Sequence, residues 1–244
     1  MHYTGRKLEI VTLDAARYLV TVTTSSIGTG INHDDETIVF PYLLGRMKAR
    51  SLVGELMSVN AELSVLSATI FLEMIPQGEE IVRGIHDELS TAYDTEIPLQ
   101  VHFHPHADNG KTIMALMATG AVYKDRVKID STKSKDYVYA LGNPKHAEEI
   151  NNLDSKELAK LYCVKELAES PSIHEIIILN GQSIIETIEY IERNEDLVMQ
   201  LETADEELIN KKGYGASCLL FTSTNKVRNE NYDGIALHYL GRMV

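Results

Sequence analysis

Hydrophobic and polar residues recur along the first half of the chain in patterns that predict both strands and helices. Runs rich in β-branched residues predict strands, and apolar residues at helical spacing predict two helices. Strands are expected over 7–13, 18–24, 65–74, 97–102 and 112–123, and helices over 42–60 and 79–93. The order β-β-α-β-α-β-β is typical of an α+β unit with a mostly antiparallel sheet and helices on one face.

A charged segment divides the chain. Eight of the thirteen residues over 124–136 are charged and few are apolar. We therefore expect two domains, 1–126 and 127–244. The second domain is predicted to be α/β, with helices over about 155–169, 183–193 and 205–211 between short strands.

Composition and charge narrow the class of protein. The chain has 244 residues, of which 44% are hydrophobic, and a formal net charge of −13. Such an acidic surface repels nucleic acids and anionic membranes, so we expect neither as a partner. No apolar run is long enough to cross a bilayer, and the two cysteines form no C-x-x-C pair. We expect a cytoplasmic protein.

Acidic residues stand where the predicted elements break. Asp14 lies between the first two strands, Asp35 lies in the loop that follows them, and Glu55 lies in the first helix. Carboxylates brought together from such places hold Mg²⁺ on a nucleotide triphosphate, because Mg²⁺ prefers hard oxygen ligands. The alternative from spacing alone is a solvated acidic loop.

A short loop rich in serine and glycine follows the second predicted strand. Its candidate phosphate-binding residues are Ser25, Ser26, Gly28 and Gly30. Backbone N–H groups in such a loop cradle phosphate. The segment is not a P-loop, because the Gly-Lys-Ser/Thr that would complete one is missing. The alternative is an ordinary turn.

These features occur together in an order that resembles a known family. The residues 25–30, Asp35, the helix from Gly45 to Ala61, and the segment from Glu73 to Ile85 are similar to the first domain of the aminoimidazole ribonucleotide (AIR) synthetase-like, or PurM-like, superfamily. The resemblance covers residues 7–122 and is weaker afterwards. Within the superfamily it is strongest to the branch that includes bacterial α-ribazole kinases.

The resemblance implies a function and a site. Members use ATP, hold Mg²⁺ with carboxylates and dimerise by joining their N-terminal sheets. It therefore implies ATP- and Mg²⁺-dependent phosphoryl transfer to a small molecule such as α-ribazole in cobamide salvage, and a homodimer formed through the N-terminal domain. Asp35 and Glu55 are implied as metal ligands, with Asp14 as a further one. The 25–30 loop is implied to lie near phosphates or substrate.

Three departures from the family pattern keep an alternative open. Thr24 stands where the family usually has Asp, Ile27 interrupts a glycine pair, and 100–111 replaces a later glycine-rich segment. Losing an acidic ligand removes charge that holds the metal. The alternative is a diverged protein on the same fold that binds a nucleotide or metabolite without turnover.

A histidine run suggests a third hypothesis. His102, His104 and His106 alternate, so in an extended segment they share one side. Neutral imidazoles bind Zn²⁺ and similar ions, and Asp108 is a further candidate ligand. The alternatives are a polar strand end or histidines that contact substrate phosphate.

Overall fold

A five-stranded sheet forms the frame of the first half. The structure is a computed structural model that describes residues 6–105, 110–203, 205–228 and 232–244. The strand order is β1-β2-β7-β5-β6, and neighbours are antiparallel except for the parallel pair β5 and β6. The strands are β1 (Leu8–Thr12), β2 (Arg17–Ile27), β5 (Glu62–Ile70), β6 (Leu99–Phe103) and β7 (Ile113–Tyr123). The mostly antiparallel sheet predicted from the sequence is confirmed.

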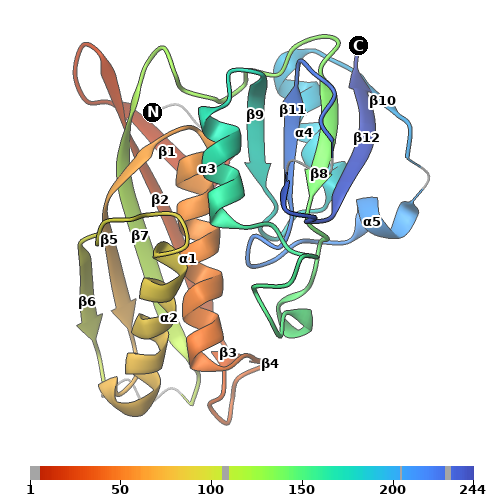
Figure 1. Cartoon of the computed structure of the whole chain (residues 1–244). Helices are drawn as coiled ribbons and strands as arrows, with labels where there is room; N and C mark the ends of the chain where they lie inside the picture. Colours follow the sequence, from red (N-terminus) through yellow and green to blue (C-terminus); the bar gives the residue numbers. More distant parts are fainter. Residues whose placement is uncertain (1–5, 106–109, 204, 229–231) are drawn as a thin grey trace.

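Two helices, α1 (Pro41–Ser58) and α2 (Glu79–Leu89), cover one face of this sheet (Figure 1). Alternation along the strands decides which face that is, because successive side chains point to opposite sides. On β2, Val20 and Val22 are buried beneath the helices, whereas Thr23 lies on the opposite, exposed face. The smaller elements of this half are β3 (Thr29–Gly30), β4 (Thr37–Ile38) and the turn η1 (Met74–Gly78).

The second half is a second five-stranded sheet with helices on both faces. Its order is β10-β12-β8-β11-β9, and all neighbours are antiparallel. Helices α4 and α5 pack on one face, and α1 and α3 pack on the other. The elements are β8 (Tyr137–Leu141), η2 (Ala147–Glu149), α3 (Leu161–Glu169), β9 (Ile173–Ile178), α4 (Ile184–Glu195), β10 (Met199–Leu201), α5 (Glu206–Asn210), β11 (Leu219–Ser223) and β12 (Leu237–Met243).

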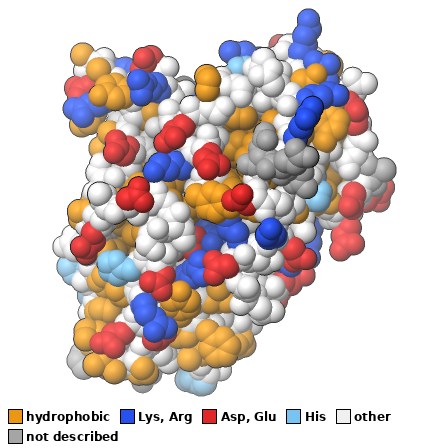
Figure 2. All heavy atoms as spheres, in the orientation of Figure 1, with side chains coloured by type: hydrophobic (Ala, Val, Ile, Leu, Met, Phe, Trp, Pro, Cys, Tyr) orange, Lys and Arg blue, Asp and Glu red, His pale blue; other side chains and the backbone are white. Residues whose placement is uncertain are grey.

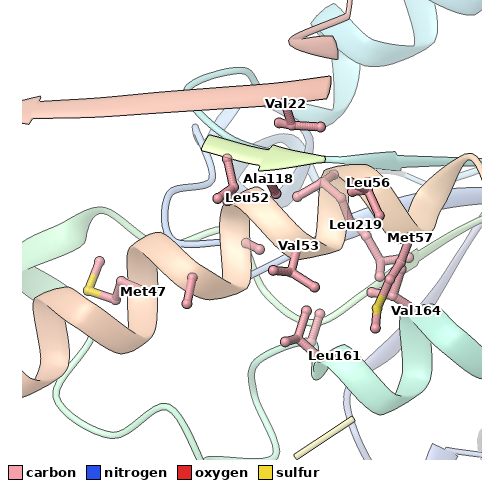
Figure 3. Close-up of a cluster of buried hydrophobic side chains, with 14 of the residues drawn as sticks. Val22, Met47, Leu52, Val53, Leu56, Met57, Ala118, Leu161, Val164 and Leu219 are labelled. Carbon is pink, nitrogen blue, oxygen red and sulfur yellow. The ribbon is translucent and has the colours of Figure 1, made fainter. Parts of the chain in front are cut away.

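Helix α1 lies between the two sheets and is buried over most of its circumference. Figure 3 shows Leu52 on the side of the first sheet, near Ala118, and Val53 on the side of α3, near Leu161. Even charged residues of this helix, such as Arg50 and Glu55, are buried. One hydrophobic core therefore joins the two halves. The predicted boundary at residue 126 falls in the segment that connects β7 to β8, and it stays a prediction.

The third helix begins later than the sequence pattern indicates. The pattern allows a start at Asp154 or Ser155, but α3 begins at Leu161. Asp154 accepts hydrogen bonds from the Arg46 guanidinium instead of capping a helix, with an Nη2–Oδ1 distance of 2.8 Å. Tight turns occupy the intervening residues, where the Leu158 amide donates to the carbonyl of Ser155. The ion pair between Arg46 and Asp154 therefore uses the carboxylate that the sequence pattern assigned as the helix cap, and the helix begins at Leu161.

A buried ion-pair cluster joins α1 and α2. Glu88 on α2 is fully buried and accepts from Arg50 Nε at 2.5 Å and from Arg46 Nε at 2.9 Å. Arg50 also donates to the carbonyl oxygens of Leu153 and Ala159. Figure 2 shows Lys or Arg side chains among Asp and Glu side chains where the two halves meet near the centre of this face.

Among the described residues, no helix is long and apolar enough to cross a membrane.

Candidate functional site

A cleft between the two halves is the candidate functional site, and we call it the inter-half cleft. It encloses about 380 Å³. The first half contributes the end of β2, the β3 and β4 segments and one side of α1, and the second half contributes three loops. The lining residues are Ser25, Ser26, Ile27, Thr29, Thr37, Leu44, Met47, Lys48, Ser51, His146, Ala147, Glu148, Asn180, Tyr214 and Gly215. Hydroxyl groups and a lysine therefore face a space between two halves.

Two glycines shape the chain as it leaves β2. Gly28 has φ +72°, a left-handed conformation that disfavours side chains, and its amide donates to the Thr112 carbonyl. At Gly30, a Cβ would lie 2.1 Å from Thr112 Oγ1 and 2.6 Å from the Asp35 carboxylate. Both glycines thus permit the β3–β4 turn to pack closely, which places the serine hydroxyls at the cleft. Gly28 and Gly30 themselves do not line it.

A third glycine brings the second half against α1. Gly215 has φ +59°, and a Cβ there would lie 3.0 Å from the Met47 side chain. The neighbouring Tyr214 lies beside the His146 ring, with 5.7 Å between centroids. A side chain at position 215 would be strained by the positive φ and would require the Met47 side chain to shift.

Two lysines approach the cleft without carboxylate partners. Lys48 Nζ donates to the Ser25 carbonyl at 3.2 Å, and Lys7 Nζ donates to the Asn180 carbonyl. Neither forms an ion pair with a carboxylate among the described residues. Burial lowers the pKa of Lys48 below its usual value of 10.5, and the nearby charge of Lys7 lowers it further. Burial also lowers the pKa of Lys7, against the opposing effect of Glu55.

Of the predicted metal ligands, Asp35 lies near the cleft but is engaged in hydrogen bonds. Its Oδ1 accepts from the Thr112 amide at 2.7 Å, and its Oδ2 accepts from Thr112 Oγ1 at 2.7 Å and from the Asn32 amide at 2.8 Å. The carboxylate therefore fastens the β3–β4 turn to the start of β7.

The other two predicted ligands lie elsewhere. Asp14 closes the β1–β2 hairpin, where it accepts from the Ala16 amide and from the Arg17 side chain. That hairpin is at the far end of β2 from the cleft, a separation of about 30 Å for a strand of this length. Glu55 is buried on α1 and pairs with Arg6 at 3.2 Å. The fold does not bring Asp14, Asp35 and Glu55 together.

The histidine run lies on β6 and beyond it. His102 is exposed on β6, and His104 follows the strand and stacks on Phe71 with 5.0 Å between ring centroids. His106 and Asp108 lie outside the described residues. Within the part of the chain that the structure describes, no group of three His, Cys, Asp or Glu residues is placed to hold a metal ion.

Sequence reasoning identified Ser25 and Ser26 but missed the lysines. A signal for Lys48 was present, since three cationic residues, Arg46, Lys48 and Arg50, fall within five positions of a largely apolar helix. Buried cations need partners. Arg46 and Arg50 have Glu88, whereas Lys48 has a carbonyl alone. Lys7 could not be found in this way because only the tertiary fold places it beside α1.

The fold is similar to that of several solved proteins, in agreement with the fold that the sequence resemblance implies. PurL of Thermotoga maritima, complexed with ADP, matches with a TM-score of 0.67 at 12% identity over 98% of this chain. Thiamine monophosphate kinase of Aquifex aeolicus matches with a TM-score of 0.65 at 13% identity over 96% of this chain. The hydrogenase maturation protein HypE, in complex with ATP, matches with a TM-score of 0.60 at 13% identity over 92%.

The lengths of these proteins differ from that of this chain. The chain spans 42% of that PurL chain, 89% of the thiamine monophosphate kinase and 76% of HypE. No protein-family model and no curated protein sequence matches it. At such low identities the likeness establishes the fold alone, because proteins of one fold can have different activities.

Proposed function

We propose that the chain catalyses phosphoryl transfer from ATP to a small-molecule acceptor bound in the inter-half cleft. The observation that carries the proposal is the half-buried Lys48, which lacks a carboxylate partner and lies among the hydroxyls of Ser25, Ser26 and Ser51. Solved proteins of this fold are complexed with ATP, ADP or AMPPCP, and one of them also with TMP. These neighbours support a nucleotide as the ligand.

The proposed chemistry depends on positioning and on neutralising phosphate charge. Lysine ammonium groups and hydroxyl donors in a cleft that excludes water stabilise the charge that spreads over the transferred phosphoryl group. We further propose α-ribazole as the acceptor, on the strength of the sequence resemblance. That Asp14, Asp35 and Glu55 hold Mg²⁺ stays a prediction. Among the described residues, these three carboxylates do not share a site.

Binding without turnover is the second candidate function. It is favoured by the engagement of Asp35 with Thr112 and of Glu55 with Arg6, which leaves the cleft with one lining carboxylate among the described residues, Glu148. The chain would then hold a nucleotide or metabolite in the same cleft and transfer nothing.

A thermal-shift titration followed by a turnover assay tests both candidates. At a hundred times its dissociation constant, a ligand of the native state adds about 2.7 kcal/mol of stability, which raises Tm by about 5 °C or more for a chain of this size. We expect this rise with ATP, and phosphorylated α-ribazole by mass spectrometry. A rise without product favours the binding protein, and no rise with millimolar ATP refutes both phosphoryl transfer from ATP and the binding of ATP without turnover.

We also propose a homodimer formed through the open face of the first sheet. That face carries a shallow hollow of about 440 Å³ lined by small and hydroxyl side chains, with Met117 exposed beside it. Light scattering should give twice the chain mass of 27.3 kDa. Met117→Arg, which sets a charge on this face, should give the monomer. A monomeric wild-type protein would contradict the proposal.

A further inference from the structure

The carboxylates expected to hold Mg²⁺ do not fit that role in this fold. Asp14 is about 30 Å from the cleft, at the other end of β2. Asp35 accepts three hydrogen bonds from Asn32 and Thr112, and Glu55 is buried against Arg6. A first shell for Mg²⁺ needs oxygen atoms that converge on one point in near-octahedral geometry. These three oxygen donors serve three different structural purposes at three places.

Positive charge occupies the cleft instead. Lys48 is half-buried on α1, and Lys7 comes from the segment that precedes β1. Lys7 lines a second cavity of about 250 Å³ rather than the inter-half cleft itself, and it donates to the carbonyl of Asn180, which lines the inter-half cleft. The two cavities therefore adjoin at Lys7. Both ammonium groups contact carbonyl oxygens and neither forms an ion pair among the described residues, although the charge of Glu55 acts on Lys7.

Two like charges held close together and partly out of water are unfavourable unless an anion accompanies them. Burial and mutual repulsion lower the pKa of Lys48, which is the physical signature of that cost. The hydroxyls of Ser25, Ser26 and Thr29 line the same cleft and can donate hydrogen bonds to phosphate oxygens, whereas that of Ser51 already donates to the Met47 carbonyl. The arrangement matches an anion that carries several oxygen atoms.

We infer that Lys7 and Lys48 anchor the phosphate chain of the nucleotide directly, so that nucleotide binding to this chain does not require Mg²⁺. The inference rests on the proposed function for the nature of the ligand and deepens it by naming what neutralises the phosphates. Lysine serves as a compact point charge for phosphate. A free nucleoside diphosphate is more negative than its Mg²⁺ complex and should bind this lysine pair at least as tightly.

Calorimetric titration of the full chain with ADP, in EDTA and in Mg²⁺, tests the inference. ADP carries no γ-phosphate, so binding is measured without transfer. We expect ADP to bind in EDTA with an affinity equal to or higher than that in Mg²⁺. Lys48→Met and Lys7→Met should each weaken binding in EDTA about 10- to 100-fold, since each removes a charged hydrogen-bond donor. Lys48→Arg keeps the charge and should lose less.

The control variant is Lys226→Met. Lys226 is exposed beyond the end of β11 and lies over the Tyr137 ring, 5.6 Å from its centroid, so its loss should leave ADP affinity unchanged. Thermal melting of Lys48→Met guards against misfolding. Because burial makes the Lys48 charge unfavourable, its removal should leave Tm equal or higher.

The outcomes separate the inference from the proposed function. Binding of ADP that appears only in Mg²⁺ overturns the lysine anchor and leaves nucleotide binding intact. Binding in EDTA that is the same for wild type, Lys7→Met and Lys48→Met also overturns it. If ADP binds under neither condition, the proposed function fails together with the inference.

Discussion

Replacing Glu88 with glutamine is expected to lower the free energy of unfolding by about 3–5 kcal/mol, because it removes one partner of a buried ion pair. Glu88 is fully buried and its two carboxylate oxygens receive both Arg46 and Arg50. A neutral amide of the same shape would leave the buried Arg50 guanidinium without a counterion. Urea unfolding followed by circular dichroism measures the change.

Glu80→Gln is the matched control on the same helix. Glu80 pairs with Arg83 at 2.5 Å, but both side chains are largely exposed to solvent. Exposed pairs of this kind contribute about 0.3–0.5 kcal/mol. A loss of similar size in the two variants would show that burial of the Glu88 cluster does not matter to stability.

Replacing Gly45 with alanine is expected to destabilise the protein by about 3 kcal/mol or more, through overpacking between α1 and α2. A Cβ at Gly45 would lie 2.1 Å from the Ile81 carbonyl oxygen, and one at Gly84 would lie 2.1 Å from the Tyr42 carbonyl oxygen. The contacts are reciprocal and involve backbone atoms, so no side chain can move aside. The helices would have to separate, which thermal unfolding would register as a drop in Tm.

Gly54→Ala supplies the control within the same helix. A Cβ at Gly54 would meet its nearest atom, Ile178 Cδ1, at 3.5 Å, which is an ordinary van der Waals contact. Alanine is favoured over glycine inside a helix by about 0.5–1 kcal/mol, so this variant should be as stable as wild type or slightly more stable. A marked loss at Gly54, or none at Gly45, would contradict the close helix contact.

The pattern of apolar residues was sufficient to predict most of the elements. Alternation in β2 and helical spacing in α1 are local properties. Burial follows the alternation in β2, whereas α1 forms where its spacing predicts a helix but is buried on nearly all sides. The start of α3 was not predictable in this way. It depends on Arg46, which lies 108 residues before Asp154 along the chain and donates hydrogen bonds to the Asp154 carboxylate.

Some residues at the candidate site could likewise be predicted from the sequence, whereas the partners of others depend on the fold. Ser25 and Ser26 follow a recognisable strand and do line the inter-half cleft, and their role in binding stays a prediction. The sequence resemblance implies Asp35 and Glu55 as metal ligands, but a sequence carries no information on which groups the two carboxylates contact. The fold supplies those partners as Thr112 and Arg6.

The sequence by itself determined the succession of strands and helices, the acidic surface and the resemblance to the AIR synthetase-like superfamily, because each depends on residues close together in the chain. Only the tertiary structure decided which charges meet. It joined Lys7 to the Asn180 carbonyl and paired Glu55 with Arg6, across separations of 173 and 49 residues. Ion pairs and unpaired charges of this kind follow from how α1 packs between the two sheets, which no local pattern contains.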